Sequence, residues 1–206
     1  GETTGDMARE ITYRDALREA LREEMDRDER VFLMGEDIGA YEGSYVVTRG
    51  FLQEYGRKRV RDTPISELAI VGLANGAAMG GLRPVVELMT INFSLLAMDQ
   101  IVNHAAKIHY MFNGQFTVPI VIRTASGWGQ LGATHSQTFE AWYAHVPGLR
   151  VVMPATPKDA KGFLKSAIRS DDPVMFIEHS LIYRNRGEVP EGEYLLPLEG
   201  AEVRRE

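Results

Sequence analysis

Segments with the pattern of a strand alternate with segments with the pattern of a helix along nearly the whole chain, and this order restricts its fold more than any other feature. Short apolar runs such as VFLMGED at residues 31–37 are typical of buried strands, and apolar residues spaced three and four apart are typical of helices. The order predicts an α/β fold with three layers, in which helices cover both faces of a parallel sheet. The expected strands are 31–37, 59–62, 84–89, 118–124, 149–153 and 174–178, and the expected helices are 13–27, 51–55, the segment after Pro64, 94–111, 137–145 and 158–169.

In sheets of this kind, ligands bind outside the carboxyl ends of the strands. The residues that follow directly on a predicted strand are therefore the first candidates for a functional site. They are Glu36, Glu67, residues 89–93 and residues 126–135.

The charge balance and the missing motifs argue against several classes of function. The 206 residues carry 23 basic and 29 acidic side chains, a net charge of -6, whereas nucleic acids and anionic membranes bind clustered basic surfaces. The chain has no cysteine, so disulfides and thiolate metal sites are impossible. Glycine loops that bind phosphate, the HExxH zinc motif and the GxSxG esterase motif are absent. We therefore predict neither a nucleic acid nor a membrane as a partner.

The stretch DTPISELAIVGLANGAAMGG, residues 62–81, places Gly72, Gly76 and Gly80 on one stripe of a predicted helix. A glycine inside a helix costs about 1 kcal/mol relative to alanine, so the three together cost roughly 3 kcal/mol. A stripe without side chains offsets this cost if it lets another backbone approach closely. That backbone belongs either to the domain's own sheet or to a partner subunit, and the spacing alone favours neither.

Two titratable residues lie at the expected edge of the sheet. Glu67 is in the first turn of the glycine helix, where an acid gains about 0.3–1 kcal/mol from the helix dipole and needs no other role. The uncharged run that follows it supports a functional interpretation, because a carboxyl group sheltered from water can share or move a proton. His135, in GATHSQ, is either a surface residue or a candidate acid or base.

Five long stretches carry a family resemblance: MGEDIGAYEGSYVVTRGF, RDTPISELAIVGLANGAAMGGLRPVVELMTINF, AMDQIVNHAAK, THSQTFEAWYAHVPGLRVVMPATPKDAKG and KSAIRSDDPV. In this order they closely resemble the beta subunits of pyruvate dehydrogenase, in the family of thiamine-diphosphate-dependent 2-oxo acid dehydrogenases. The resemblance extends from about Ile11 to the end of the chain. It implies the thiamine-diphosphate-binding fold, with this chain as the pyrimidine-type domain. That fold agrees with the alternation of strands and helices.

The resemblance also implies roles for residues at the sheet edge. Glu67 matches the glutamate that bonds to a pyrimidine nitrogen of the cofactor and promotes its imino tautomer, which moves a proton within the cofactor. Phe93 is expected to stack on the aminopyrimidine, Met89 to line the pocket of that ring and Ile65 to belong to the same cofactor-binding set. Glu36 corresponds to an acid in a polar passage between two active sites.

Further roles follow for a histidine and for a set of carbonyl groups. His135 matches a histidine beside the reacting centre, expected to help with substrate binding or with acyl transfer to a lipoyl group. A structural potassium ion of the family is held by main-chain carbonyls, and the sequence SDDP departs from the usual one at that turn, although carbonyl ligands tolerate such a change. The corresponding carbonyls are those of Ile120, Ala167, Ile168, Ser170 and Asp172.

The family assembles as a heterotetramer of alpha and beta subunits, with the cofactors bound between chains. The GDG and NN signature of the diphosphate and magnesium site is absent here, and in the family the alpha subunit carries it. The chain is therefore expected to supply half of a pocket and to have little activity alone. The implied partners are the alpha subunit, a second beta subunit and the lipoyl domain of the acyltransferase, which favours an interface at the glycine stripe.

Two alternatives stay open. Within the family, the chain could be a branched-chain 2-oxo acid or acetoin dehydrogenase beta subunit, although AAMGGLRPVVELMTINF and QTFEAWYAH favour the pyruvate type. Outside it, the chain could be a non-catalytic domain that binds partners. The trio Glu67, Phe93 and His135 argues against that last function, since a binding module has no need of it.

The resemblance divides the chain into three parts. Residues 1–10 are interpreted as a tag or disordered start, residues 11–183 as the pyrimidine-binding domain, and residues 184–206 as a linker toward a C-terminal domain that the chain lacks. The sequence shows no targeting segment, which favours the cytoplasm of a bacterium over a mitochondrial matrix.

Overall fold

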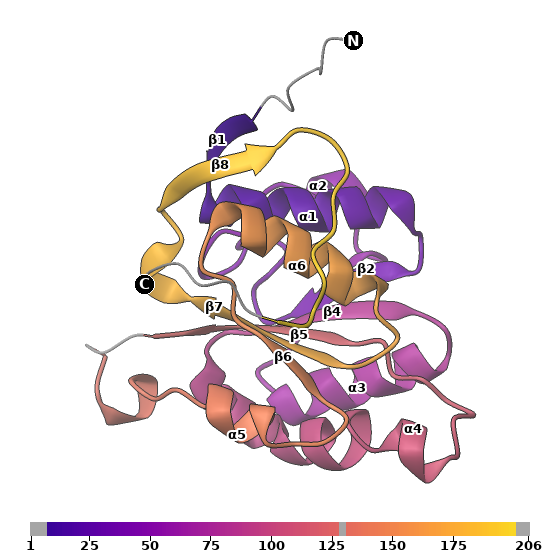
Figure 1. The fold of residues 1–206 in the computed structure, drawn as a ribbon. Coiled ribbons are helices and arrows are strands. Elements are labelled where there is room, and N and C mark those ends of the chain that lie inside the picture. The colour runs from indigo at the N-terminus through magenta and orange to yellow at the C-terminus, as the bar shows by residue number, and fades with distance from the viewer. Residues whose placement is uncertain (1–7, 128–130, 201–206) are drawn as a thin grey trace.

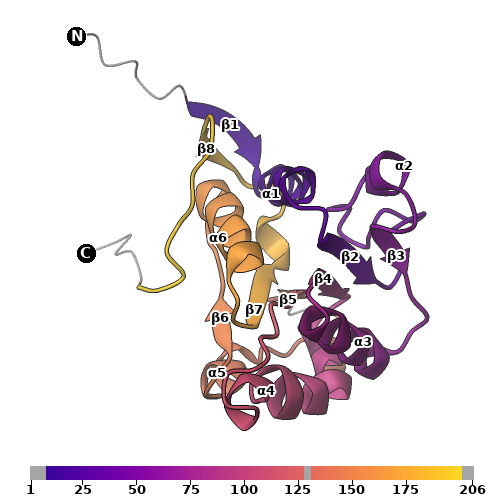
Figure 2. The ribbon, with the colours of Figure 1, turned by 90° about the vertical axis from the view of Figure 1, so that its right-hand side faces the viewer.

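The computed structural model describes residues 8–127 and 131–200. Its main sheet has six parallel strands in the order β3-β2-β4-β5-β7-β6. The sequence predicted a parallel sheet but not this strand order. The central strands β4, β5 and β7 are the longest, and β3 and β6 form the two edges (Figure 2). The strands are β2 (Val31–Gly35), β3 (Val60–Asp62), β4 (Arg83–Leu88), β5 (Val121–Ser126), β6 (Arg150–Val152) and β7 (Val174–His179).

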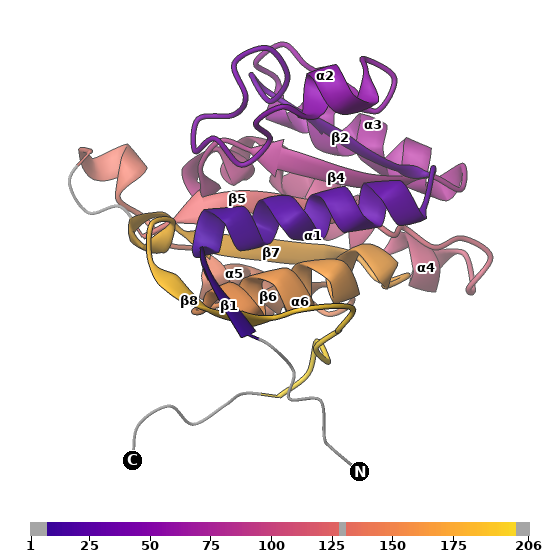
Figure 3. The same ribbon diagram turned by 90° about the horizontal axis from the view of Figure 1, so that it is seen from above.

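Helices cover both faces of this sheet, which confirms the predicted three layers. On one face α1 (Tyr13–Arg27) and α6 (Pro157–Arg169) lie side by side along the strands (Figures 1 and 3). On the other face lie α3 (Glu67–Met79), α4 (Ile108–Met111) and α5 (Glu140–Ala144), while α2 (Phe51–Tyr55) lies near the edge strand β3 (Figures 1 and 2). None of the helices in the described ranges is long and apolar enough to cross a membrane.

The core is split by the sheet into two apolar layers because successive side chains of a strand point to opposite faces. In β4, Val85 packs with the α1 and α6 side, whereas Val86 packs with the α3 side. Helix α1 begins where the sequence predicted, since the side chain of Thr12 caps it by accepting a hydrogen bond from the amide of Asp15 at 3.1 Å. The two apolar layers hold the sheet between them and so position the carboxyl ends of its strands, where the functional site lies.

The helix predicted over residues 94–111 is broken into three pieces. A 3₁₀ helix, η1 (Ile91–Ala97), and a π-helix, η2 (Gln100–Ala105), precede α4. Because a 3₁₀ helix has three residues per turn, it rotates its side chains away from the face that an α-helix would present. Leu95 of η1 is accordingly 40% exposed.

A second, two-stranded sheet joins the beginning and the end of the described chain. Strand β1 (Ala8–Thr12) pairs antiparallel with β8 (Arg186–Pro190), beyond α1 and α6 (Figure 3). The sequence predicted no strand in either segment, so the region interpreted as a linker begins with a paired strand. Residues 1–7 and 201–206, which complete the predicted start and linker, lie outside the described residues.

Gly148, in the turn between α5 and β6, is expected to tolerate no side chain. Its φ angle is 92°, and a Cβ atom there would overlap the carbonyl oxygen of Ala106. Gly192 has a similar φ of 89° but open space around it, so it is a matched control for backbone strain alone. In urea unfolding, Gly148→Ala should lower the free energy of unfolding by about 1–3 kcal/mol more than Gly192→Ala. Equal losses of unfolding free energy in the two variants would show that the backbone at Ala106 shifts without cost to make room for the new side chain.

Candidate functional site

The carboxyl edge of the sheet brings three of the predicted residues together. Glu36 follows β2, and Met89 follows β4, which is hydrogen-bonded to β2 in the sheet. Glu67 begins α3, which packs against β4 and η1. Ser66 is the N-cap residue of this helix, and the amide of Ile70 donates to the carbonyl of Ser66 at 2.9 Å. The parallel topology thus gathers residues that are far apart in the sequence.

Two carboxylates lie close enough at this edge to affect each other. Burial raises the pKa of Glu36, and the negative charges of Glu67 and then Asp37 raise it further. Glu67 is only 5% exposed, yet its carboxylate has no hydrogen bond or ion pair within the described residues. A nearly buried carboxylate without a donor is unusual, because desolvation is costly unless a partner compensates for it. This arrangement fits a ligand that supplies a donor, such as a protonated ring nitrogen.

Phe93 and His135 contact each other beyond the carboxyl ends of β4 and β5. Phe93 is carried by η1 and His135 by η3 (Ala133–His135), and their rings make an edge contact with centroids 5.3 Å apart. Helix η1 is held against α5 by a buried hydrogen bond of 2.5 Å between Ser94 Oγ and Tyr143 Oη. Ile65, just before α3, is 78% exposed, which leaves an apolar side chain at the mouth of the site.

The glycine stripe faces away from the sheet. Helix α3 turns its apolar residues Ile70, Val71, Ala74 and Ala78 inward, while a Cβ at Gly76 would meet nothing within 4 Å. At Gly72 it would meet the side chain of Gln100 at 3.3 Å, and Gly80 is the C-cap of the helix rather than an interior residue. Close packing against the domain's own sheet is therefore not the reason for the stripe.

Most of the carbonyl oxygens predicted to hold potassium already accept hydrogen bonds. The guanidinium Nη1 of Arg83 donates to the carbonyls of Ile168 and Ser170 at 3.0 Å each. The carbonyl of Ala167 accepts from the amide of Ser170 at 3.2 Å, and that of Ile120 accepts from Val174 at 2.9 Å. A carbonyl oxygen has two lone pairs, so the set can still bind a cation beside these donors. No cluster of three or more acidic or histidine side chains with metal-binding geometry occurs in the described ranges.

A buried ionic network that the sequence patterns did not predict lies at the carboxyl ends of β4, β5 and β7, near Met89. Arg123 of β5 donates to Glu178 of β7 at 2.6 and 2.9 Å and to Glu87 of β4 at 2.9 Å, and Tyr183 donates to Glu178 at 2.6 Å. Burial lowers the pKa of Arg123, but Glu178 and Glu87 outweigh it, so the pKa is raised. One charged residue near the carboxyl end of each of three predicted strands was the signal that could have revealed it.

Comparison with known proteins identifies what the chain is similar to. The family described as "Transketolase, pyrimidine binding domain" matches residues 9–186. A rice protein, "Pyruvate dehydrogenase E1 component subunit beta-2, mitochondrial" (Oryza sativa subsp. japonica), is 52% identical over 97% of this chain and 54% of its own length. "Pyruvate dehydrogenase E1 component subunit beta" of Rhizobium meliloti (strain 1021) is 52% identical over 95% of this chain and 43% of its own length. The chain thus spans about half the length of these relatives.

A solved structure supports the fold alone. The protein titled "Split gene transketolase, inactive beta4 tetramer" aligns with a TM-score of 0.64 and 21% sequence identity. The alignment covers 84% of this chain and 51% of that one. The similarity is therefore to one part of a larger subunit with the same α/β architecture.

Proposed function

Because this chain belongs to the family of transketolase pyrimidine-binding domains, we propose that it supplies the pyrimidine half of a thiamine diphosphate site. The enzyme in question is the decarboxylating component of a pyruvate dehydrogenase complex. The observation that carries the proposal is the nearly buried carboxylate of Glu67, which has no donor in the described residues and lies beside Glu36.

The residues of this chain have distinct tasks in that site. Bound thiamine diphosphate supplies the reactive carbon and the electron sink for decarboxylating a 2-oxo acid. Glu67 holds and moves a proton at the ring nitrogen, and the uncharged inner face of α3 keeps water from that carboxylate. Phe93 stacks on the ring, while Met89 and Ile65 enclose it. His135, in edge contact with Phe93, assists substrate binding or transfer of the acetyl group to a lipoyl domain.

The remaining half of the site comes from a partner. The alpha subunit holds the diphosphate and magnesium, and it packs with a second beta subunit around the glycine stripe of Gly72, Gly76 and Gly80. One feature of the sequence supports an incomplete site in this chain: it lacks GDG and NN.

Reconstitution with substrates of each class tests the proposal. The chain is mixed with a pyruvate-type alpha subunit, and turnover of pyruvate, of a branched-chain 2-oxo acid and of acetoin is measured with an artificial electron acceptor. We expect pyruvate to be preferred by at least about tenfold, in line with the discrimination that one or two methyl groups allow. A preference for the branched substrate or for acetoin would favour the rival subunits. A complex that forms without any turnover would favour a non-catalytic binding domain.

The potassium site is proposed at the C-terminal end of α6, where carbonyl dipoles favour a cation. Arg83 already places a positive charge on Ile168 and Ser170 and therefore weakens potassium binding. In Arg83→Met, potassium chloride should raise the melting temperature more than sodium chloride does. This difference between the two salts should be larger than in the unaltered chain. Identical responses to the two salts in both proteins would remove potassium from this site.

The cellular compartment remains a prediction. Relatives of this chain include proteins named as mitochondrial and a protein of the bacterium Rhizobium meliloti. The cytoplasm of a bacterium is our first choice and a mitochondrial matrix the second.

A further inference from the structure

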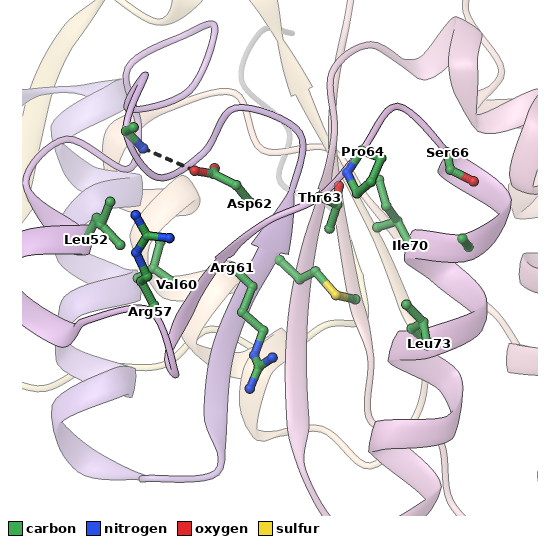
Figure 4. Close-up of a pocket in the computed structure, with 13 residues that line it drawn as sticks. Leu52, Arg57, Val60, Arg61, Asp62, Thr63, Pro64, Ser66, Ile70 and Leu73 are labelled. Carbon is green, nitrogen blue, oxygen red and sulfur yellow. Dashed lines mark hydrogen bonds between the residues drawn. The ribbon is translucent and has the colours of Figure 1, made fainter.

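A cavity along the open edge of the sheet has no role in the proposed function. It measures about 690 Å³, a size typical of ligand sites, and opens beside β3, which pairs only with β2. In Figure 4, Leu52, Arg57 and Val60 lie on one side of β3, Ile70 and Leu73 of α3 lie on the other, and Arg61 lies between them. We call this cavity the edge groove.

The edge groove continues into a second cavity further along the same edge. The second cavity measures about 290 Å³ and shares Met34, Arg61 and Leu73 with the first. Together they form one elongated surface between α3 and the strand edge. Leu73 is 65% exposed, so an apolar side chain is open to solvent in the part that both cavities share.

A cluster of unpaired positive charge borders the groove. Four of the five residues 57–61 are basic, although the whole chain has a net charge of -6. Within the described residues, the side chains of Arg57, Lys58 and Arg61 form no ion pair with any acid. Asp62, next to Arg61 in the sequence, already accepts hydrogen bonds from the amides of Gly39 at 2.6 Å and Ala40 at 3.3 Å. The groove therefore combines apolar walls with uncompensated cations.

We propose that the edge groove binds an acidic polypeptide segment with apolar side chains, supplied by a partner protein. Its carboxylates pair with Arg57 and Arg61, and its apolar side chains cover Leu73 and the wall of α3. Charge complementarity selects an acidic occupant, and the apolar lining selects one that also carries hydrophobic groups. The lining of the main cavity includes no aromatic residue, so it offers none of the stacking surfaces that single-stranded nucleic acids use.

Fluorescence anisotropy with a designed probe tests this proposal on the chain alone, without cofactor. The probe is a fluorescein-labelled peptide of eight residues that alternates leucine and glutamate, and its counterpart alternates leucine and lysine. Only the glutamate peptide should bind. The charge reversal R57E/R61E should weaken its binding by about tenfold or more, since two attractions become repulsions. Leu73→Ser should weaken it by at least about threefold.

Two control variants match these changes elsewhere on the surface. Arg184 is exposed and has no ion pair in the described residues, and Leu181 is 59% exposed. Arg184→Glu and Leu181→Ser should leave binding within about twofold, well below the tenfold step that marks 1.4 kcal/mol. The proposal is overturned if the peptide does not bind, or if the groove and control variants bind it equally. It is also overturned if an oligonucleotide or polyglutamate binds as tightly as the leucine–glutamate peptide and its binding is unchanged by Leu73→Ser. None of these readouts depends on thiamine diphosphate, so the proposed function stands or falls separately.

Discussion

Glu67→Gln is expected to reduce decarboxylation by the assembled enzyme by about 10²–10⁴-fold, the range that a positioned proton-transfer group contributes. Glutamine keeps the size of the side chain but cannot hold or release the proton at the ring nitrogen. The fold should survive, because the acid at the start of α3 contributes only about 0.3–1 kcal/mol through the helix dipole. Turnover of pyruvate with a saturating electron acceptor measures the loss.

A second readout on the chain alone separates chemistry from folding. The charge of Glu67 helps to raise the pKa of Glu36, so in Glu67→Gln that pKa should fall toward its ordinary value, which NMR titration can follow. Glu54→Gln is a suitable control, since Glu54 also lies in the first turn of a helix but pairs with Arg22 far from the site. Near-normal turnover in Glu67→Gln would contradict the proton-transfer role, whatever the behaviour of Glu36.

Arg123→Met should destabilise the chain by about 3–5 kcal/mol at neutral pH, the usual result of removing one partner of a buried ion pair. Arg123 is 3% exposed and is the cation between Glu178 and Glu87, which would then face each other without compensation. Urea unfolding measures the loss. In Arg150→Met, whose pairs with Asp172 and Glu199 are largely exposed, the loss should stay below about 1 kcal/mol.

The destabilisation should also depend on pH. Burial raises the pKa of Glu87, the charge of Arg123 opposes that rise, and Glu178 adds to it. Without Arg123 the pKa of Glu87 in the folded chain rises further. A carboxyl group whose pKa is raised by folding favours the folded state below its unfolded pKa, near pH 4.3, and loses this contribution as the pH rises. The deficit of Arg123→Met should therefore grow between about pH 4 and pH 7. A deficit that is independent of pH would mean that lost packing, not charge, causes it.

The sequence predicted that Glu36, Glu67 and Met89 lie at one edge of the sheet. This prediction requires only local sequence patterns and one rule of topology. Strands that alternate with helices form a parallel sheet, and parallel strands end at a common edge. The contact between Phe93 and His135 is consistent with the roles that the family resemblance assigned. Those roles, like the limits of 11–183 for the domain, remain predictions.

Other features depend on contacts between distant segments, which periodicity does not contain. The break in residues 94–111 is accompanied by a hydrogen bond of 2.9 Å from Asn75 of α3 to the carbonyl of Gln100, which lies at the start of the π-helix. Strands β1 and β8 form only because the two ends of the chain meet. The spacing of the glycines also does not show what packs against the stripe. The open space around Gly76 argues only against close packing on the domain's own sheet.

Calorimetric titration with thiamine diphosphate and magnesium tests the central claim most directly. The titration is carried out on this chain alone and on its mixture with a pyruvate-type alpha subunit. The proposed half-site predicts binding in the mixture and none to the isolated chain. Tight binding to the isolated chain would contradict the division of the site between two subunits, and no binding in the mixture would contradict the role of this chain in that site.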